Sequence, residues 1–268
     1  MTGLPALRSR AAHVAGSSVI VLLYTFLLMP LVAVVAASLT AGEFMRLPPE
    51  GLSLRWFARF FQRGDLVEAL LMSLRIALVT TLVTSVLGLM AALASQALSR
   101  RLAVWFQIGM TLPLLIPELL TAIGLLFFLY KIGLGKTVLG LQIGHIVLAF
   151  PYCYVSVAAA LRQIDPALDD ASGSLGASGW QTFRHVTLPL AMPGLVMGAV
   201  FAFITSFDLY TVSLLLKPIG GNTLPLALFD FLTYEFSPTA AAAATMSVLL
   251  AFVGVAVIHK LVGLQRAF

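Results

Sequence analysis

The chain has 268 residues, of which 60% are hydrophobic and only 10% are charged, and its 16 basic and 11 acidic side chains give a formal net charge of +5. A soluble domain has roughly 45–50% apolar and about 25% charged residues, so this composition excludes a soluble globular enzyme. The single cysteine, Cys153, excludes a disulfide within the chain and any multi-cysteine metal site. The positive charge does not indicate nucleic-acid binding, because basic residues of membrane proteins commonly lie at lipid headgroups.

Six apolar stretches are long enough to cross a bilayer, for which a helix needs about 20 residues. The predicted spans make residues 1–268 a single all-α transmembrane domain and cover approximately residues 17–38, 70–97, 102–130, 138–161, 190–216 and 239–262. The first follows Arg8 and Arg10, as in a signal peptide, but its apolar run exceeds the roughly 7–15 residues of a signal core. This favours an anchor. Six spans place both termini on the same side of the membrane.

The orientation of these spans does not follow from charge alone. Basic residues divide almost evenly between the two sides, so the positive-inside rule decides nothing. The first loop, about residues 39–67, contains the sequence SLRWFARFF, in which Arg55, Arg59 and Arg63 share one helical face beside aromatic residues. This pattern is typical of an interfacial amphipathic helix, which either anchors the chain at headgroups or docks an external partner.

The turn predicted at residues 131–137 ends in GLGKT and superficially resembles a phosphate-binding loop. That motif needs a glycine five positions before Gly135, where the chain has Tyr130, and it follows a strand. We therefore interpret the segment as a short turn between helices and expect no nucleotide site in this chain.

Residues 163–188, between the fourth and fifth spans, form the longest polar stretch in the second half of the chain. Asp165 followed by Pro166 predicts a helix start, and Gly176 predicts its end. Ser178 and Gln181 have the spacing of a capping box. They predict a second short helix that ends near Pro189. Its apolar residues would be Trp180, Phe183 and Val186.

The same stretch reads DASGSLGASGWQTFRHVTLP and matches a known pattern: Glu-Ala-Ala, three residues, Gly, nine residues, Ile, one residue, Leu-Pro. The matching residues are Asp170, Ala171, Ser172, Gly176, Val186, Leu188 and Pro189. All spacings hold, and Asp for Glu, Ser for Ala and Val for Ile are mild departures. The pattern resembles the cytoplasmic loop of permease subunits of binding-protein-dependent ABC importers. With six spans, the resemblance covers essentially the whole chain.

This resemblance implies a type I ABC importer permease fold. In that family the loop is a coupling helix that docks in a cleft of a cytoplasmic ATPase, and closure of the ATPase dimer moves it. Trp180 and Phe183 would serve as interface anchors. The implied partners are an ABC ATPase dimer, a second and different permease chain, a periplasmic or extracellular substrate-binding protein and membrane lipid, without nucleic acid or cofactor. The chain would be a transport subunit of the bacterial inner membrane, without its own ATPase site, and with both termini in the cytoplasm.

A narrower resemblance concerns the substrate. The segments FITSFDLYTVSLLL and TLPLALFDFLTYEFSPTAAAAAT resemble spermidine/putrescine importer permeases, in the smaller of their two permease types. This implies a polyamine or a related small organic cation. Relatives with similar segments import opines, aminoethylphosphonate or iron, so these substrates remain alternatives.

Two acidic residues fall within predicted spans, where charged groups are costly and mark functional sites. Glu118 follows Pro117 in the third span, and Asp208 lies in the fifth. We expect both to line a path for a cation, with Tyr210 and Tyr130 offering aromatic faces for cation–π contacts. The alternatives are a position at a span edge or ion pairs with Arg75, Lys131 or Lys217.

The other polar and small residues within spans favour structural roles. We expect Arg75 to extend to the headgroups and His145 to be a hydrogen-bonded core histidine, although a proton relay is an alternative. Two GxxxG pairs predict close helix contacts, namely Gly140 with Gly144 and Gly194 with Gly198. An ion-coupled secondary transporter using Glu118 and Asp208 is the alternative function, but such proteins often have internal repeats, and the sequence shows none.

Overall fold

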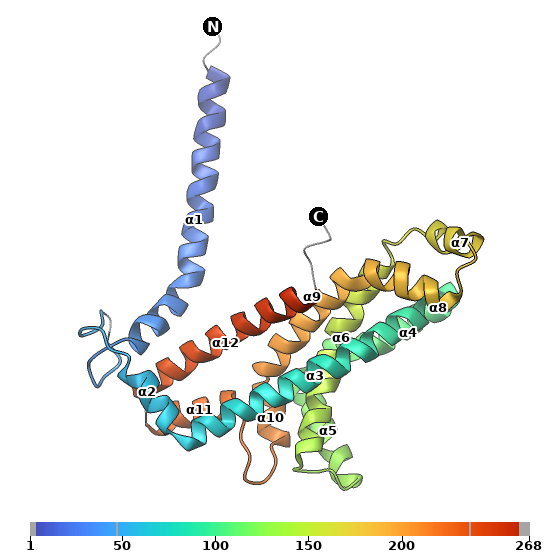
Figure 1. Cartoon of the computed structure of the whole chain (residues 1–268). Helices are drawn as coiled ribbons and strands as arrows, with labels where there is room; N and C mark the ends of the chain where they lie inside the picture. The colour runs from blue at the N-terminus through green and yellow to red at the C-terminus, as the bar shows by residue number, and fades with distance from the viewer. Residues whose placement is uncertain (1–3, 47, 236, 263–268) are drawn as a thin grey trace. The chain divides into compact units, whose positions relative to one another are not determined.

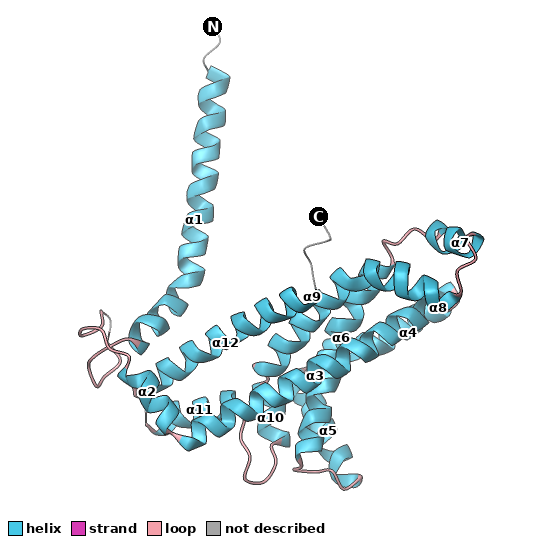
Figure 2. Ribbon diagram, viewed as in Figure 1, coloured by secondary structure: helices cyan, strands magenta, loops and turns pink. Residues whose placement is uncertain are grey.

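The structure is a computed structural model and describes residues 4–46, 48–235 and 237–262. Over these residues it consists of helices and loops (Figure 2), and a single isolated β-bridge joins Thr40 to Leu52. The elements in chain order (Figure 1) are α1 (Leu4–Ser38), α2 (Arg55–Gln62), α3 (Gly64–Gln96), α4 (Arg100–Leu115), α5 (Glu118–Lys131), α6 (Val138–Leu161), α7 (Ala167–Ser174), α8 (Gly179–Thr182), the π-helical turn η1 (Phe183–Thr187), α9 (Leu188–Phe207), α10 (Tyr210–Leu216), α11 (Leu224–Tyr234) and α12 (Pro238–Val262).

Five helical segments of the described chain are long and apolar enough to cross a membrane, and the bent pair α4–α5 makes a sixth if it counts as one span. The five are Gly16–Ser38, Gly64–Gln96, Val138–Leu161, Gly179–Phe207 and Pro238–Ile258. Lipid offers no hydrogen bonds to the backbone, so apolar runs of this length satisfy their own amides as helices. Each of the six predicted spans therefore has a helical counterpart.

The predicted third span, residues 102–130, is sharply bent. Its two halves, α4 and α5, meet at an angle of 100°. Pro117 has no N–H to donate and disfavours a helical conformation in the residue before it. Ile116 accordingly adopts an extended backbone, with φ −91° and ψ 134°. Glu118 is therefore the first residue of a new helix instead of a mid-helix residue.

The predicted fifth span, residues 190–216, differs from its expected form at both ends. It breaks after Phe207, and α10 resumes the helix at Tyr210. At its start the chain is already helical from Gly179, so the prediction that the preceding short helix ends near Pro189 is wrong. In the π-helical turn η1 the N–H of Leu188 donates to the carbonyl of Phe183. This wider turn keeps the chain helical although Pro189 has no N–H of its own.

The chain divides into two compact units, the first formed by residues 1–63 and 231–247. In this unit α2 is amphipathic as predicted, but part of its aromatic face is buried in protein instead of facing headgroups. Trp56 is 3% exposed and Phe60 is fully buried. The Trp56 indole donates to the carbonyl of Thr40 over 2.8 Å. These contacts make α2 an integral part of its unit.

The basic face of α2 also contacts protein groups. Arg63 forms a salt bridge with Glu235 at 2.9 Å, and its guanidinium lies 5.2 Å from the ring centre of Phe231. Arg55 donates to the carbonyl of Gly42. The arginines therefore help to fix the first loop within this unit.

The second unit contains residues 64–230 and 248–268, and its core is centred on α6. Glycines bring helices close to α6, as the GxxxG pairs predict. A Cβ at Gly198 would lie 2.8 Å from the Cα of Cys153, and one at Gly194 would lie 2.5 Å from Ala160. Gly144 closely contacts Val212 and Leu216 of α10. Gly140 departs from the prediction, since its nearest neighbour is a carbonyl of the preceding turn.

One apolar cluster of this unit holds the two broken spans together. It joins residues of α3, α5, α6 and α10. Its buried members are Ile76, Ala122, Leu129, Leu141, Leu148, Leu209, Val212 and Leu216. The helices that begin after the two breaks, α5 and α10, thus share one core, which places the breaks in the same region of the unit.

Candidate transport path and coupling loop

Each of the two broken spans carries an acidic residue at its break. Glu118 is the first residue of α5, and Asp208 is the C-cap of α9. Asp208 is exposed, while Glu118 is half-buried, with an Oε1 atom that is inaccessible to solvent and has no hydrogen-bond partner. The helices that begin at the two breaks meet in one apolar cluster, which includes Ala122 of α5 and Leu209 beside Asp208. Both acids therefore lie at breaks in the same region of the unit.

The backbone at the second break adds to the negative character of this region. The last carbonyl groups of a helix have no partner within it and carry the negative end of the helix dipole. The C-terminal end of α9 is at Asp208, where the backbone leaves the helical conformation at Leu209, with φ −72° and ψ 89°. Carbonyl oxygens and a carboxylate at one position favour a positively charged ligand.

The alternative of internal ion pairs is not what the structure shows. In the part of the chain that the structure describes, Glu118 and Asp208 have no salt bridge to a basic residue. Arg75 is exposed, as expected for a side chain that extends toward headgroups. Neither acid is therefore neutralised by a basic side chain in this part of the chain.

The two tyrosines expected near the acids differ in position. Tyr210 begins α10 two residues after Asp208 and is half-buried, with its ring centre 5.4 Å from that of Phe229. Tyr130 lies near the other end of α5 from Glu118, about 18 Å away along the helix at 1.5 Å per residue, and is packed against Gly135. Tyr210 therefore lies beside the break, whereas Tyr130 does not.

The coupling segment folds as the capping signals predict. The Asp165 carboxylate accepts from the N–H of Ala167 at 2.9 Å, which caps the start of α7. The end of α7 is a Schellman motif, in which the N–H of Ala177 bonds to the carbonyl of Ser172 and that of Gly176 bonds to Gly173. Gly176 has φ +83°, a conformation that L side chains rarely adopt.

The second helix begins with the predicted capping box. The Ser178 hydroxyl accepts from the N–H of Gln181, and the Gln181 side chain accepts from the N–H of Ser178. A contact that the sequence did not predict joins the two helices, since the hydroxyls of Ser172 and Thr182 lie 2.7 Å apart. Ser172 donates to the carbonyl of Asp169, so it accepts from Thr182.

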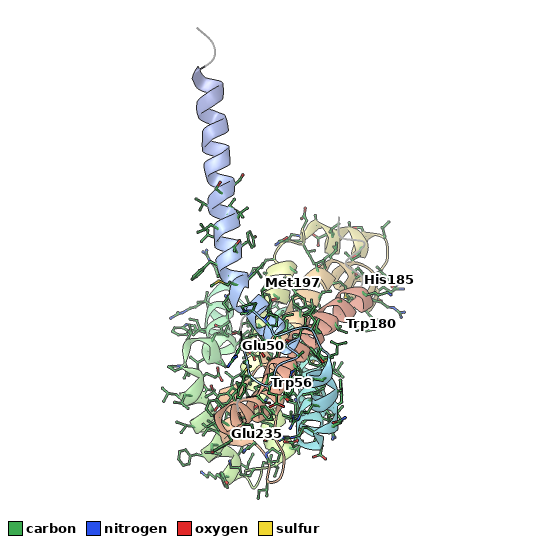
Figure 3. The ribbon with its side chains drawn as sticks, turned by 90° about the vertical axis from the view of Figure 1, so that its left-hand side faces the viewer. Glu50, Trp56, Trp180, His185, Met197 and Glu235 are labelled. Atoms are coloured by element: carbon green, nitrogen blue, oxygen red, sulfur yellow. The ribbon has the colours of Figure 1, made fainter. Side chains whose placement is uncertain are left out.

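The remaining residues of the predicted coupling motif present a mostly exposed surface. Trp180 is 66% exposed, and its ring lies 5.4 Å from that of the half-buried Phe183. Trp180 and His185 extend from the same end of the helix that continues into α9 (Figure 3). The exposed residues of the motif are Asp170, Ala171, Gly176 and Pro189, and the half-buried ones are Val186 and Leu188. Exposed aromatic side chains beside polar ones suit a protein interface.

Residues 84–263 match the family described as the binding-protein-dependent transport system inner membrane component. The chain belongs to this family. It is 28% identical over 262 residues to the putrescine transport system permease protein PotI of Escherichia coli K12, covering 95% of this chain and 91% of PotI. It is 30% identical over 225 residues to a putative 2-aminoethylphosphonate transport system permease protein, PhnV, of Salmonella paratyphi A, covering 83% of both chains.

The fold matches that of permease subunits in solved ABC importers. A chain of the bacterial alginate ABC transporter, in complex with an alginate pentasaccharide-bound periplasmic protein, superposes with a TM-score of 0.72. The two are 18% identical, and the match covers 94% of each chain. The predicted class, an all-α membrane protein with the type I importer permease fold, is confirmed. The chain is a permease subunit of an ABC importer and a multi-pass protein of the inner membrane.

Two other segments of this permease have structural roles. His145 is a buried, hydrogen-bonded core residue, as expected. The GLGKT segment is a short turn between α5 and α6, with Gly133 and Lys136 in the left-handed region. The ammonium group of Lys136 donates to the carbonyl of Leu215 at 3.0 Å, so this lysine fastens the turn to α10.

Proposed function

We propose that this permease carries a small organic cation, most closely a polyamine such as spermidine or putrescine, past Glu118 and Asp208. The observation that carries the proposal is the position of the two acids at two helix breaks that share one apolar cluster, without a salt bridge to either acid in the described part of the chain. An acid without an ion pair inside a membrane protein favours a positively charged partner. A substrate that bears ammonium groups supplies one at each acid.

The names of the relatives support this chemistry. Putrescine and 2-aminoethylphosphonate, which appear in the names of PotI and PhnV, share a primary amine that is protonated at neutral pH. Tyr210 provides an aromatic face beside Asp208 that suits such a group. Opines, aminoethylphosphonate and iron remain the competing substrates, and ligand binding by the partner protein separates them from a polyamine.

We further propose that residues 163–188 couple the path to ATP hydrolysis on another chain. The exposed Trp180 and the fixed turn at Gly176 offer an anchor and a rigid shape to an ABC ATPase dimer. Under this proposal the loop and both chain termini lie in the cytoplasm. The complete importer would contain a second, different permease chain and a periplasmic substrate-binding protein, and the chain itself would need no cofactor and no nucleic acid.

The test is uptake by the complete importer reconstituted in proteoliposomes. Asp208→Asn and Glu118→Gln should each raise the KM for polyamine uptake at least tenfold, because each removes one charge that faces the ammonium groups. Glu68→Gln is the matched control, since Glu68 is an exposed acid of α3 and should leave uptake unchanged. Binding of only anionic ligands by the partner protein would overturn the proposal that the substrate is a cation. Uptake driven by an ion gradient without ATP would favour a secondary transporter instead.

A further inference from the structure

A buried chain of hydrogen bonds spans the break in the fifth membrane segment. His145 of α6 is 1% exposed. Its Nδ1 lies 2.9 Å from the hydroxyl of Ser206 in α9, and its Nε2 lies 3.1 Å from the hydroxyl of Ser213 in α10. The Ser213 hydroxyl in turn donates to the carbonyl of Leu209 at 2.6 Å. One imidazole ring therefore joins both sides of the break.

The direction of each hydrogen bond follows from the donors available. Ser213 has one hydroxyl proton, which it gives to Leu209, so it must accept from the N–H at Nε2 of His145. A neutral ring then has an acceptor at Nδ1, which takes the hydroxyl proton of Ser206. The hydrogen bonds run from Ser206 through His145 and Ser213 to the Leu209 carbonyl. With a neutral imidazole ring, every group in this series has the donor or acceptor that it needs.

This chain of bonds acts on the residues next to Asp208. Ser206 precedes Asp208 by two positions, and Leu209 follows it directly. The break takes the Leu209 carbonyl out of α9, and Ser213 gives it a partner. Gly144, beside His145, lets Val212 and Leu216 of α10 approach α6 closely. The backbone on both sides of Asp208 is thereby fixed to α6, while the Asp208 side chain stays exposed.

We propose that His145 is a positioning residue for transport, which holds the α9–α10 break in the geometry that presents Asp208 to the path. The role of Asp208 in transport rests on the proposed function. We do not expect His145 to contact the substrate. It fixes the end of α9 and the start of α10 to α6, and another side chain with one acceptor and one donor in the same places can also do this.

The experiment uses the complete importer in proteoliposomes, with His145→Leu and His145→Gln. Leucine removes both hydrogen bonds, whereas glutamine keeps one acceptor and one donor without charge. Gln142→Leu is the matched control on the same helix. Gln142 is also buried, but its amide donates to Thr80 of α3 at 2.7 Å and not to the break.

A second measurement reports the position of residue 208 without depending on the substrate. Asp208→Cys is introduced with Cys153→Ala, and the rate of reaction with a cationic, membrane-impermeant thiol reagent is measured. His145→Leu should change this rate at least fivefold, and in the otherwise native chain it should raise the KM for uptake at least tenfold. His145→Gln should restore both values to within about threefold, and Gln142→Leu should change neither.

Two results would overturn the inference: native labelling and native uptake kinetics in His145→Leu, or equal effects of His145→Leu and Gln142→Leu. If His145→Leu does not assemble, Ser213→Ala replaces it, because that variant breaks the same chain with a smaller change. The failure of the proposed function is separate. Normal polyamine uptake by Asp208→Asn would refute the role of Asp208 in the path, yet the labelling rate would still decide whether His145 fixes the break.

Discussion

Replacement of Gly176 tests whether the turn of the coupling loop must keep its observed conformation. Gly176 has φ +83°, and an added Cβ would meet nothing within 4 Å. The only cost of Gly176→Ala is therefore backbone strain, about 1–2 kcal/mol for an L residue in the left-handed region. Such a cost lowers the population of the native turn by a factor of about 5–30.

The expected result is a graded series in uptake and in substrate-stimulated ATP hydrolysis by the reconstituted importer. Asparagine tolerates the left-handed region better than alanine, and β-branched valine tolerates it least, so activity should fall in the order Gly, Asn, Ala, Val. Gly173→Ala is the control, because Gly173 also has open space around it but lies in α7 without a positive φ. Native uptake by Gly176→Val, or an equal loss in Gly173→Ala, would refute the reasoning.

Three other substitutions test contacts described above. Gly198→Ala places a Cβ 2.8 Å from the backbone of α6, and this overpacking should lower the free energy of unfolding by about 1–3 kcal/mol. The Tm of the purified complex should fall. In the control Gly109→Ala, where an added Cβ meets nothing within 4 Å, the Tm should not change. Ser172→Ala removes the hydroxyl that accepts a hydrogen bond from Thr182, and it should destabilise the loop by about 0.5–1.5 kcal/mol. Hydrogen exchange in the coupling loop should rise, and adding Thr182→Val should raise it no further. Trp56→Phe removes the indole N–H that donates to the carbonyl of Thr40 and should destabilise the first loop by about 1–3 kcal/mol. Proteolysis of this loop should then be faster. An unchanged rate would show that the hydrogen bond does not fix the loop.

Features set by neighbouring residues were predictable from the sequence. The Ser178–Gln181 capping box and the Gly176 turn depend on groups within a few positions of each other, and both form as expected. The long apolar runs likewise gave helices at the predicted places. Pro117 disfavours a helical conformation in the residue before it, but the 100° angle depends on how α5 packs against other helices, which local sequence does not encode.

Features that depend on contacts between distant residues were not predictable. The break at Asp208 lies in the sequence TSFDLYT, which has neither proline nor glycine. Nothing in that segment indicates that His145 of α6 and Ser213 of α10 form a hydrogen bond next to the break. The burial of Trp56 was missed for the same reason, because an aromatic face predicts an apolar environment without telling lipid from protein. Pro189 predicts a helix end, but the π-helical turn before it is a local adjustment with no sequence signal, and the helix continues.

The continuity of α8, η1 and α9 links the coupling segment and the break in one element. From Gly179 to Phe207 the backbone is helical for 29 residues, so Trp180 lies near one end of this stretch and Asp208 follows the other. The stretch contains the π-helical turn η1 and, within α9, Pro193, and helices bend at such points. Beyond them, α9 packs closely on α6 at Gly194 and Gly198. We therefore expect a movement that starts at Trp180 to bend the helix near η1 and Pro193, and to reach the break only if α6 moves with α9.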